Sequence, residues 1–218
     1  TMKTITYKNT KISFTDQGKG TAVVLLHGFL ENQTMWDNFV PELSKKHRVI
    51  TVDLLGHGET ECLGYVHAME DQADMLYALL LHLKIRKVVL VGHSMGGYVA
   101  LAFAELYPDY MKGLFLLNST SRADSDERKA NRDRAIVAVK QNYTAFVRMS
   151  IANLFAEENR LPMTGLIQNL VDRHAYMKPD SLAAFLEAMM ARPDRTQILK
   201  KAKFPVLFIF GKGDQAVP

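Results

Sequence analysis

A serine between two glycines, in the segment Gly92-His93-Ser94-Met95-Gly96, is the clearest indication of chemistry in this sequence. The apolar residues Val88 to Val91 precede it and predict a buried strand, and apolar residues recur at helical spacing from Gly97 onward. A serine at the sharp corner between a strand and a helix is exposed at a helix N-terminus, where the helix dipole favours negative charge. Such a serine is suited to nucleophilic attack on a carbonyl carbon.

Other polar groups follow further predicted strands, each directly after the strand ends. The strands are the continuous apolar stretches 22–26, 48–52, 112–117 and 204–210. The first three are followed, in chain order, by His27-Gly28-Phe29, by Asp53 and by Asn118-Ser119. Ligands of parallel sheets bind beyond the carboxyl ends of the strands, so we expect these groups to converge on Ser94 at one edge.

The elements that must position these groups predict an α/β fold. Strands that are continuously apolar are covered on both faces, which indicates a mostly parallel sheet with helices on each side. Apolar spacing predicts helices over residues 36–43 and 68–83. Alternating apolar and polar residues in 3–8 and 11–16 predict an antiparallel hairpin at the N-terminus.

The composition changes after residue 119. Nine of the thirteen residues from Arg122 to Arg134 are charged, and no strand pattern returns before Phe204. We expect residues 120–196 to form a helical cap or lid inserted into a core made of residues 1–119 and 197–218. The expected helices are 126–142, 143–156, 162–174 and 181–190, with apolar faces that include Leu154, Phe155, Leu161, Leu166, Ile167, Leu170, Phe185, Met189 and Met190. A lid lined by such side chains favours a partly apolar substrate.

The overall composition excludes several classes of protein. With 218 residues, 48% apolar residues and a net charge of +4, the chain has the composition of a soluble globular protein of one domain with an insertion. We find no stretch that predicts a membrane span, no basic cluster that indicates nucleic-acid binding, and no signal peptide. The single cysteine, Cys62, fits a reducing compartment, so we expect a cytoplasmic protein, with no metal or other cofactor.

Four motifs together resemble the α/β-hydrolase superfamily, in its branch of esterases, cofactor-free haloperoxidases and the menaquinone-pathway lyase. They are His27-Gly28-Phe29, the turn Asp53-Leu54-Leu55-Gly56-His57-Gly58, the segment Gly92 to Gly97, and Gly211 to Pro218. They stand in the order of that family and span most of the chain. The second motif is similar to a structural turn of the family, in which we expect Asp53 to form the turn and His57 to bind backbone.

The resemblance implies a role for each motif. Ser94 would be the nucleophile of a nucleophile elbow, and the backbone N–H groups of Phe29 and Met95 would form the oxyanion hole. Asp214 would be the acid of a Ser-His-Asp catalytic triad, because the preceding strand ends in Asn118-Ser119, without a carboxylate. The residues expected to border the substrate pocket are His27, Gly28, Trp36 and His93. Of these, His27 would shape the oxyanion loop, Trp36 also fits simple packing, and His93 would point away from the serine.

The sequence departs from the family at the base of the triad. The histidine should follow the acid, and no histidine lies among residues 215–218. We therefore expect a truncated form, without the last strand and helix of the family and with impaired activity. Its apolar strand 204–210 would be left at an edge where copies could associate. His174, in the predicted lid, is a weak alternative base.

These observations lead to one main functional hypothesis and two alternatives. The first is a carboxylesterase-like serine hydrolase that acts on a small ester or related acyl compound through an acyl-enzyme. The second is a lyase of the same fold, in which the same triad abstracts a proton. The third is a non-catalytic protein that binds a small ligand on a hydrolase scaffold, which the missing histidine would suit.

Overall fold

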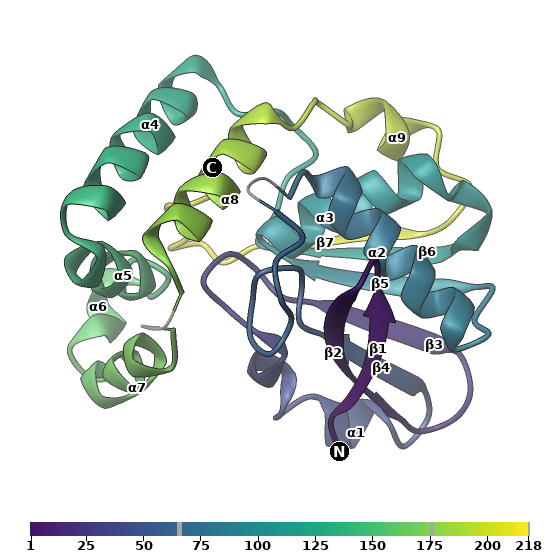
Figure 1. Cartoon of the computed structure of the whole chain (residues 1–218). Helices are drawn as coiled ribbons and strands as arrows, with labels where there is room; N and C mark the ends of the chain where they lie inside the picture. Colours follow the sequence, from purple (N-terminus) through teal and green to yellow (C-terminus); the bar gives the residue numbers. More distant parts are fainter. Residues whose placement is uncertain (65–66, 175–176, 218) are drawn as a thin grey trace.

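The computed structural model describes residues 1–64, 67–174 and 177–217, and in these the chain forms a twisted seven-stranded sheet flanked by helices (Figure 1). The strand order is β1-β2-β4-β3-β5-β6-β7. The strands are β1 (Lys3–Tyr7), β2 (Thr10–Gln17), β3 (Ala22–Leu26), β4 (Arg48–Val52), β5 (Val88–His93), β6 (Met111–Leu117) and β7 (Val206–Ile209).

The pairing of the strands confirms the predicted α/β class. Strands β4, β3, β5, β6 and β7 are parallel to one another, whereas β1 and β2 join the sheet as an antiparallel hairpin. Lys8 and Asn9 connect the hairpin with φ angles of 45° and 61°, the left-handed values that tight two-residue hairpin turns require. Strand β3 lies in the middle and is buried along its whole length, as its uninterrupted apolar sequence predicts.

Helices cover the sheet on both faces, and the hydrophobic core is larger on one face than on the other. The larger core includes α2 (Met69–His82) and α3 (Met95–Leu106), whose apolar stripes pack on one face. The opposite face has a smaller core made of Val23, Leu25, Trp36, Val40 and Val49. Two further short helices are η2 (Pro108–Tyr110) and α9 (Thr196–Lys200).

The prediction of one helix over residues 36–43 is wrong in detail, because the structure has two short helical turns there. They are the 3₁₀-helix η1 (Gln33–Trp36) and α1 (Val40–Leu43). The side chain of Asn32 accepts a hydrogen bond from the N–H of Thr34 and so caps the first turn. Pro41 is the second residue of the second turn, where its missing N–H costs no hydrogen bond.

Five helices between residues 126 and 191, which we call the helical segment, lie together beside the sheet (Figure 1). They are α4 (Asp126–Gln141), α5 (Tyr143–Ala152), α6 (Glu157–Arg160), α7 (Thr164–His174) and α8 (Pro179–Ala191). Ser125 and Asn142 cap α4 and α5, since their side chains accept hydrogen bonds from the N–H groups of Arg128 and Ala145. Helix α4 packs on α5 and α8, and α5 packs on α7.

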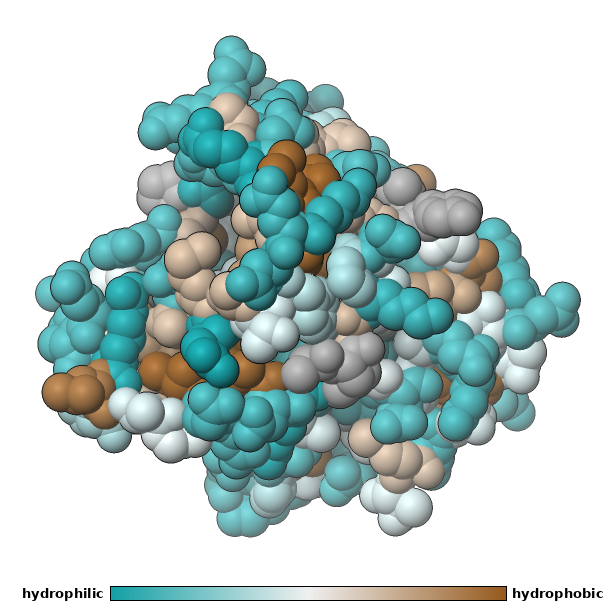
Figure 2. All heavy atoms as spheres, turned by 60° about the vertical axis from the view of Figure 1, so that its left-hand side comes forward, coloured by the Kyte–Doolittle hydropathy of each residue, from teal (hydrophilic) through white to brown (hydrophobic). Residues whose placement is uncertain are grey.

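The predicted helices of this segment correspond to the observed ones, but their ends and some of their faces differ. Helix α5 ends at Ala152, and the short helix α6 precedes α7. Leu154, Leu161 and Leu166, expected on buried faces, are exposed by 47%, 86% and 50%. Figure 2 shows that this side of the molecule is mainly hydrophilic, with separate hydrophobic patches.

A buried carboxylate joins the two ends of the helical segment. The side chain of Asp124 is fully buried and forms ion pairs with Arg128, Arg132 and Arg192, at 3.6 Å for Arg128 and 2.9 Å for Arg192. The guanidinium of Arg192 also lies 3.7 Å from the ring centroid of Tyr98 on α3. Burial opposes ionisation of Asp124, but the arginines outweigh it and lower the pKa of its carboxyl.

Strand β7 is at the edge of the described sheet. Leu207, Phe208, Ile209 and Phe210 are each more than a third exposed, and the rings of the two phenylalanines stack at 5.6 Å. None of the described helices is long and apolar enough to cross a membrane.

The Asp124 cluster gives a test of how the helical segment is held. Asp124→Asn removes the charge that three arginines share, and should lower the free energy of unfolding by about 3 kcal/mol, since it leaves buried guanidinium groups uncompensated. Asp133→Asn is the matched control, because Asp133 is exposed on α4, the helix that carries Arg128 and Arg132. The loss of its charge should cost less than about 0.5 kcal/mol. Urea unfolding measures both, and equal effects would contradict the role given to Asp124.

Candidate active site

Ser94 stands at the turn between β5 and α3, at the carboxyl edge of the sheet. Its backbone has φ 52° and ψ −117°, a conformation that costs on the order of 1–3 kcal/mol for a residue with a side chain. The N–H of Ser94 donates to the carbonyl of Leu117 (3.0 Å), and the hydroxyl of Ser119 donates to the carbonyl of Ser94 (2.8 Å). Two bonds from the end of β6 therefore hold the strained residue.

The glycines around Ser94 are required by contact distances. A Cβ atom on Gly92 would lie 2.5 Å from the carbonyl oxygen of Gly96, and one on Gly96 would lie 2.3 Å from that of Leu26. A Cβ atom on Gly97 would lie 2.1 Å from the hydroxyl of Ser119. Since real Cβ atoms do not approach so closely, the turn can form only with glycine at these positions.

Two N–H groups beside Ser94 have no acceptor in the part of the chain that the structure describes. Met95 is the first residue of α3, so its N–H cannot bond within the helix. Phe29 follows β3 in the loop that faces the elbow, where a Cβ atom on Gly28 would lie 3.2 Å from that of Ser94. No loop or turn hydrogen bond in the described part of the chain uses the N–H of Phe29 or Met95. Both groups are therefore available for a developing negative charge.

Asp214 lies at the same edge, beyond β7. Its carboxylate accepts hydrogen bonds from the side-chain amide of Asn118 (2.8 Å) and from the N–H of Ala216 (2.8 Å). Asn118 follows β6 and has a φ of 48°, and its N–H donates to the carbonyl of Ile209. The structure thus brings Ser94 and Asp214 to the ends of nearby strands, and among the described residues Asp214 has no hydrogen bond to a histidine.

His27 and His57 are fully buried and bind backbone. The Nε2 atom of His27 accepts from the N–H of Leu54 (3.0 Å), so its Nδ1 carries the proton and donates to the carbonyl of Gly28 (2.8 Å). The Nδ1 of His57 donates to the carbonyl of Leu55 (3.1 Å), and its Nε2 has no partner among the described residues. Burial lowers the pKa of both rings, well below the ordinary value for His57, so both are neutral.

His93, next to the serine, is paired with a carboxylate that the sequence analysis did not single out. Its Nδ1 lies 2.9 Å from Oε2 of Glu31, and both side chains are mostly buried. Burial would lower the pKa of His93, but the charge and hydrogen bond of Glu31 raise it, and Asp214 adds to this effect. Burial would raise the pKa of Glu31, but His93 and the N–H of Gly28 lower it. His93 is thus engaged with Glu31.

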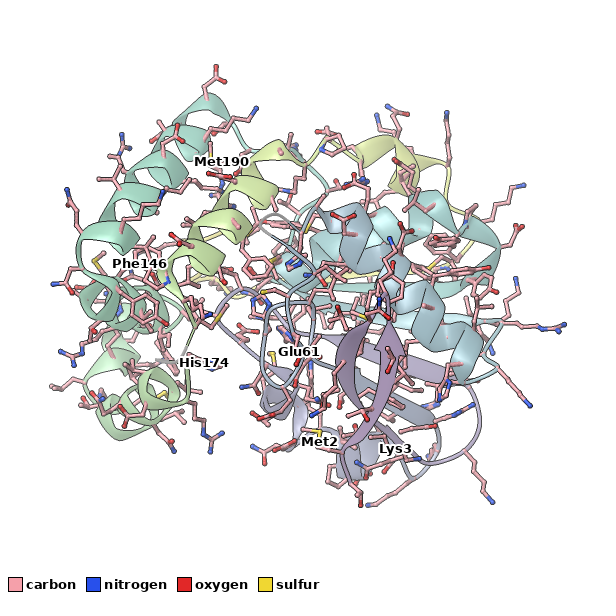
Figure 3. All side chains as sticks on the ribbon, in the orientation of Figure 1. Met2, Lys3, Glu61, Phe146, His174 and Met190 are labelled. Atoms are coloured by element: carbon pink, nitrogen blue, oxygen red, sulfur yellow. The ribbon has the colours of Figure 1, made fainter. Side chains whose placement is uncertain are left out.

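An apolar cavity of about 210 Å³ lies between this pair and the helical segment. Its walls come from the loop after β3, from α5 and the residues that follow it, and from α7, and they include Leu30, Met35, Ile151, Leu154, Phe155 and Leu170. His174, at the end of α7 (Figure 3), lines the same cavity, and burial lowers the pKa of its ring to about 4. A second cavity of about 310 Å³ has Phe29 in its wall, together with Phe146 of α5 (Figure 3) and polar side chains from α4.

The other predicted pocket residues lie apart from these cavities. Trp36 is 3% exposed and packs in the smaller core on the opposite face of the sheet. Its ring therefore contributes to core packing and does not border either cavity. His27 is fully buried before the loop of residues 28–31, and Gly28 faces Ser94 directly. Asp53 accepts hydrogen bonds from the N–H groups of Gln33 and Glu59, as expected of a turn former. Among the described residues, no three potential ligands are grouped so that they could hold a metal ion.

Comparison with known proteins identifies relatives of this arrangement. The sequence model described as the alpha/beta hydrolase fold matches residues 21–218. A thermophilic esterase from Thermogutta terrifontis superposes with a TM-score of 0.89 at 36% identity, over 100% of this chain and 82% of that one. A 2-hydroxy-6-oxononadienedioate/2-hydroxy-6-oxononatrienedioate hydrolase from Burkholderia vietnamiensis is 29% identical over 95% of this chain and 76% of its own length.

Other curated relatives are matched over a smaller part of their length. A Bacillus subtilis protein, provisionally named as a 2-succinyl-6-hydroxy-2,4-cyclohexadiene-1-carboxylate synthase, is 35% identical over 64% of this chain and 54% of its own length. The match to a protein of Mycobacterium tuberculosis, at 36% identity, spans 31% of that protein.

The buried histidines predict a loss of stability in acid. A ring whose pKa is lower in the folded than in the unfolded state contributes its full stability above the ordinary value of 6.5, and loses it as the pH falls below that value. Between pH 7.5 and pH 5, each such ring should lower the free energy of unfolding by up to about 2 kcal/mol. In His57→Phe, the free energy of unfolding should therefore fall less between pH 7.5 and pH 5 than in the wild-type protein, as measured by urea unfolding at both pH values. His82→Gln, at an exposed position, controls for the loss of an imidazole, and an unchanged dependence in His57→Phe would contradict the assignment.

Proposed function

Because the chain belongs to the α/β-hydrolase fold family, we propose that it is the nucleophile-bearing part of a serine hydrolase for small, partly apolar esters or related acyl compounds. The observation that most supports this function is the strained Ser94 beside two N–H groups that have no acceptor among the described residues. The similarity to an esterase at 36% identity supports the same reaction class. The apolar cavity beside the elbow supports an apolar group on the substrate.

In the proposed reaction, the hydroxyl oxygen of Ser94 attacks the carbonyl carbon of the ester and gives its proton to a histidine. The carbonyl oxygen becomes an oxyanion and accepts hydrogen bonds from the N–H groups of Phe29 and Met95, each worth about 3 kcal/mol in the transition state. The histidine then protonates the leaving alcohol, and water hydrolyses the acyl-enzyme by the same steps.

Asp214 would orient this histidine and stabilise its charged form. Its carboxylate is held by Asn118 and by backbone N–H groups, which supports a fixed orientation at the edge. Four described histidines are engaged in other hydrogen bonds, and His174 lies across the apolar cavity. His47 and His82 stand before β4 and β5, at the ends of these strands opposite to Ser94. The base of this mechanism would therefore come from outside the described residues, and we propose that the helical segment covers the site as a lid.

The test of the proposed function uses an activated ester such as p-nitrophenyl butyrate and a fluorophosphonate that labels nucleophilic serines. The protein should be covalently labelled at Ser94 in a form long enough to include the base. Ser94→Ala should abolish both labelling and turnover, and Asp214→Asn should lower kcat by about 10⁴-fold. Ser44→Ala, a serine far along the chain from the elbow, is the control. Unchanged turnover in Ser94→Ala would contradict the function.

A comparison of chain lengths tests the assignment of the base. Residues 1–218 alone should hydrolyse the ester at least about 10³-fold more slowly than a longer form, because loss of the base removes most of the rate enhancement. Equal turnover by the two forms would contradict the pairing of Asp214 with a histidine from outside.

A lyase reaction is the second candidate, favoured by the similarity to the Bacillus subtilis protein. In that reaction the triad would remove a proton from carbon, and no acyl-enzyme would form. Trapping of an acyl group on Ser94 by mass spectrometry distinguishes the two, since only the hydrolase accumulates it. A full-length protein without the base, and without turnover of either kind, would instead support a ligand-binding protein.

A further inference from the structure

The carboxylate of Glu31 connects the two halves of the proposed oxyanion site. Its Oε2 atom accepts a hydrogen bond from the N–H of Gly28 at 2.7 Å and one from Nδ1 of His93 at 2.9 Å. Gly28 precedes Phe29, and His93 precedes Ser94 and Met95. One carboxylate oxygen thus binds both Gly28, the residue before the Phe29 N–H group, and His93, the residue before the Ser94 nucleophile.

The loop after β3 needs such a tie because its backbone is strained. The N–H of Glu31 donates to the carbonyl of Gly28 (3.2 Å), which closes a tight turn over residues 28–31. Inside this turn Leu30 has a φ of 60°, a left-handed conformation that costs roughly 1–2 kcal/mol for a residue with a branched side chain. A strained turn keeps its geometry only where the surrounding contacts fix it. The Glu31 carboxylate provides such a contact at the start of the turn.

The same carboxylate lies close to the reacting serine. A Cβ atom on Gly28 would be 3.1 Å from the carbonyl oxygen of His93, 3.2 Å from Oε2 of Glu31 and 3.2 Å from the Cβ of Ser94. These three groups therefore surround one small volume beside Gly28. A change in the position of Glu31 would change the distance between the loop and the elbow.

The pairing with His93 makes a carboxylate at this place compatible with catalysis. A lone negative charge beside an oxyanion site would oppose the charge that develops in the transition state. A protonated His93 neutralises Glu31, and both side chains are mostly removed from water, with exposures of 19% and 12%. The pair can thus hold the loop without adding a net charge to the site.

We propose that Glu31, through Gly28 and His93, is a positioning residue that sets the Phe29 N–H relative to Ser94 and the Met95 N–H. The proposal rests on the serine-hydrolase function given above. Glu31 would act on the transition state and not on ground-state binding, because the two N–H groups bind the oxyanion more strongly than the substrate carbonyl.

The main experiment compares Glu31→Gln with the wild-type protein, in a form that turns over p-nitrophenyl butyrate. We expect kcat to fall by about 100-fold, comparable to the loss of an oxyanion donor, with KM within about threefold of the wild-type value. A trifluoromethyl ketone, which mimics the tetrahedral oxyanion, should bind more weakly by a factor similar to the loss in kcat.

Asp16→Asn is the matched control, because it also removes the charge of a largely buried carboxylate. Asp16 pairs with Arg48 at 2.7 Å, and Arg48 begins β4, at the edge of the sheet opposite to Ser94. This variant should lose stability without a change in kcat or in the affinity for the ketone. Comparison of the two variants therefore separates positioning from a general loss of stability.

A second pair of variants keeps the proposal testable if Glu31→Gln does not fold. His93→Ala removes the donor to Glu31, whereas the amide of His93→Asn can occupy the place of Nδ1–H. The kcat of His93→Asn should be at least tenfold higher than the kcat of His93→Ala.

Two outcomes would overturn the proposal. They are a folded Glu31→Gln whose kcat and ketone affinity stay within threefold of wild type, and equal kcat in the two His93 variants. Absence of turnover and of Ser94 labelling in the wild-type protein would instead contradict the proposed function itself, so the two failures are distinguishable.

Discussion

The close crossing of β5 and α3 at Ser94 is the constraint on which the rest of the site depends. The strand must turn into the helix within one residue, and that residue has a left-handed φ of 52°. Neighbouring backbone approaches so closely that Gly92 and Gly96 have no room for a side chain, and the side chain of Ser119 occupies the space beside Gly97. The strain persists because β3 and the end of β6 pack against the turn from two sides, which fixes both the serine and the first N–H groups of the helix.

Burial gives the histidines near this turn two different electrostatic states. Desolvation is the largest influence on His27 and His57 and lowers the pKa of both rings, which hold the loops after β3 and β4 by hydrogen bonds to backbone groups. His93 has the carboxylate of Glu31 at hydrogen-bond distance, and this outweighs its burial. The pKa values of these three histidines thus shift in different directions, because only His93 has a carboxylate at hydrogen-bond distance.

The helical segment is anchored at its two ends and encloses space in between. Asp124 links the beginning of α4 to the end of α8 through its arginines, and Arg192 packs on Tyr98 of the core. Helices α5 and α7 are therefore held opposite the loop of residues 28–31, where apolar side chains leave a cavity next to Glu31 and His93. The proposed site for the acyl group is this cavity, so it depends on how the helical segment is held beside the sheet.

The sequence by itself determined the elements whose burial leaves a simple pattern. Strands over residues 22–26 and 48–52 were predicted to the residue, because strands covered on both faces are apolar throughout. The turn at Ser94 followed from glycine spacing, and the place of the residues after β3 and β6 beside it at one edge followed from the rule for parallel strands. Periodicity failed where local capping intervened, as at Pro41 and Asn32, and it could not tell that Leu161 faces water.

Only the tertiary structure decided how the loops at this edge are tied together. The bond between Glu31 and His93 joins residues 62 positions apart, and it depends on the left-handed turn at Leu30, for which leucine gives no sequence signal. The neutral state of His57 and the packing position of Trp36 likewise depend on neighbours from other elements. Sequence spacing specifies residues that share an element, whereas contacts between loops arise when the sheet brings the loop ends together.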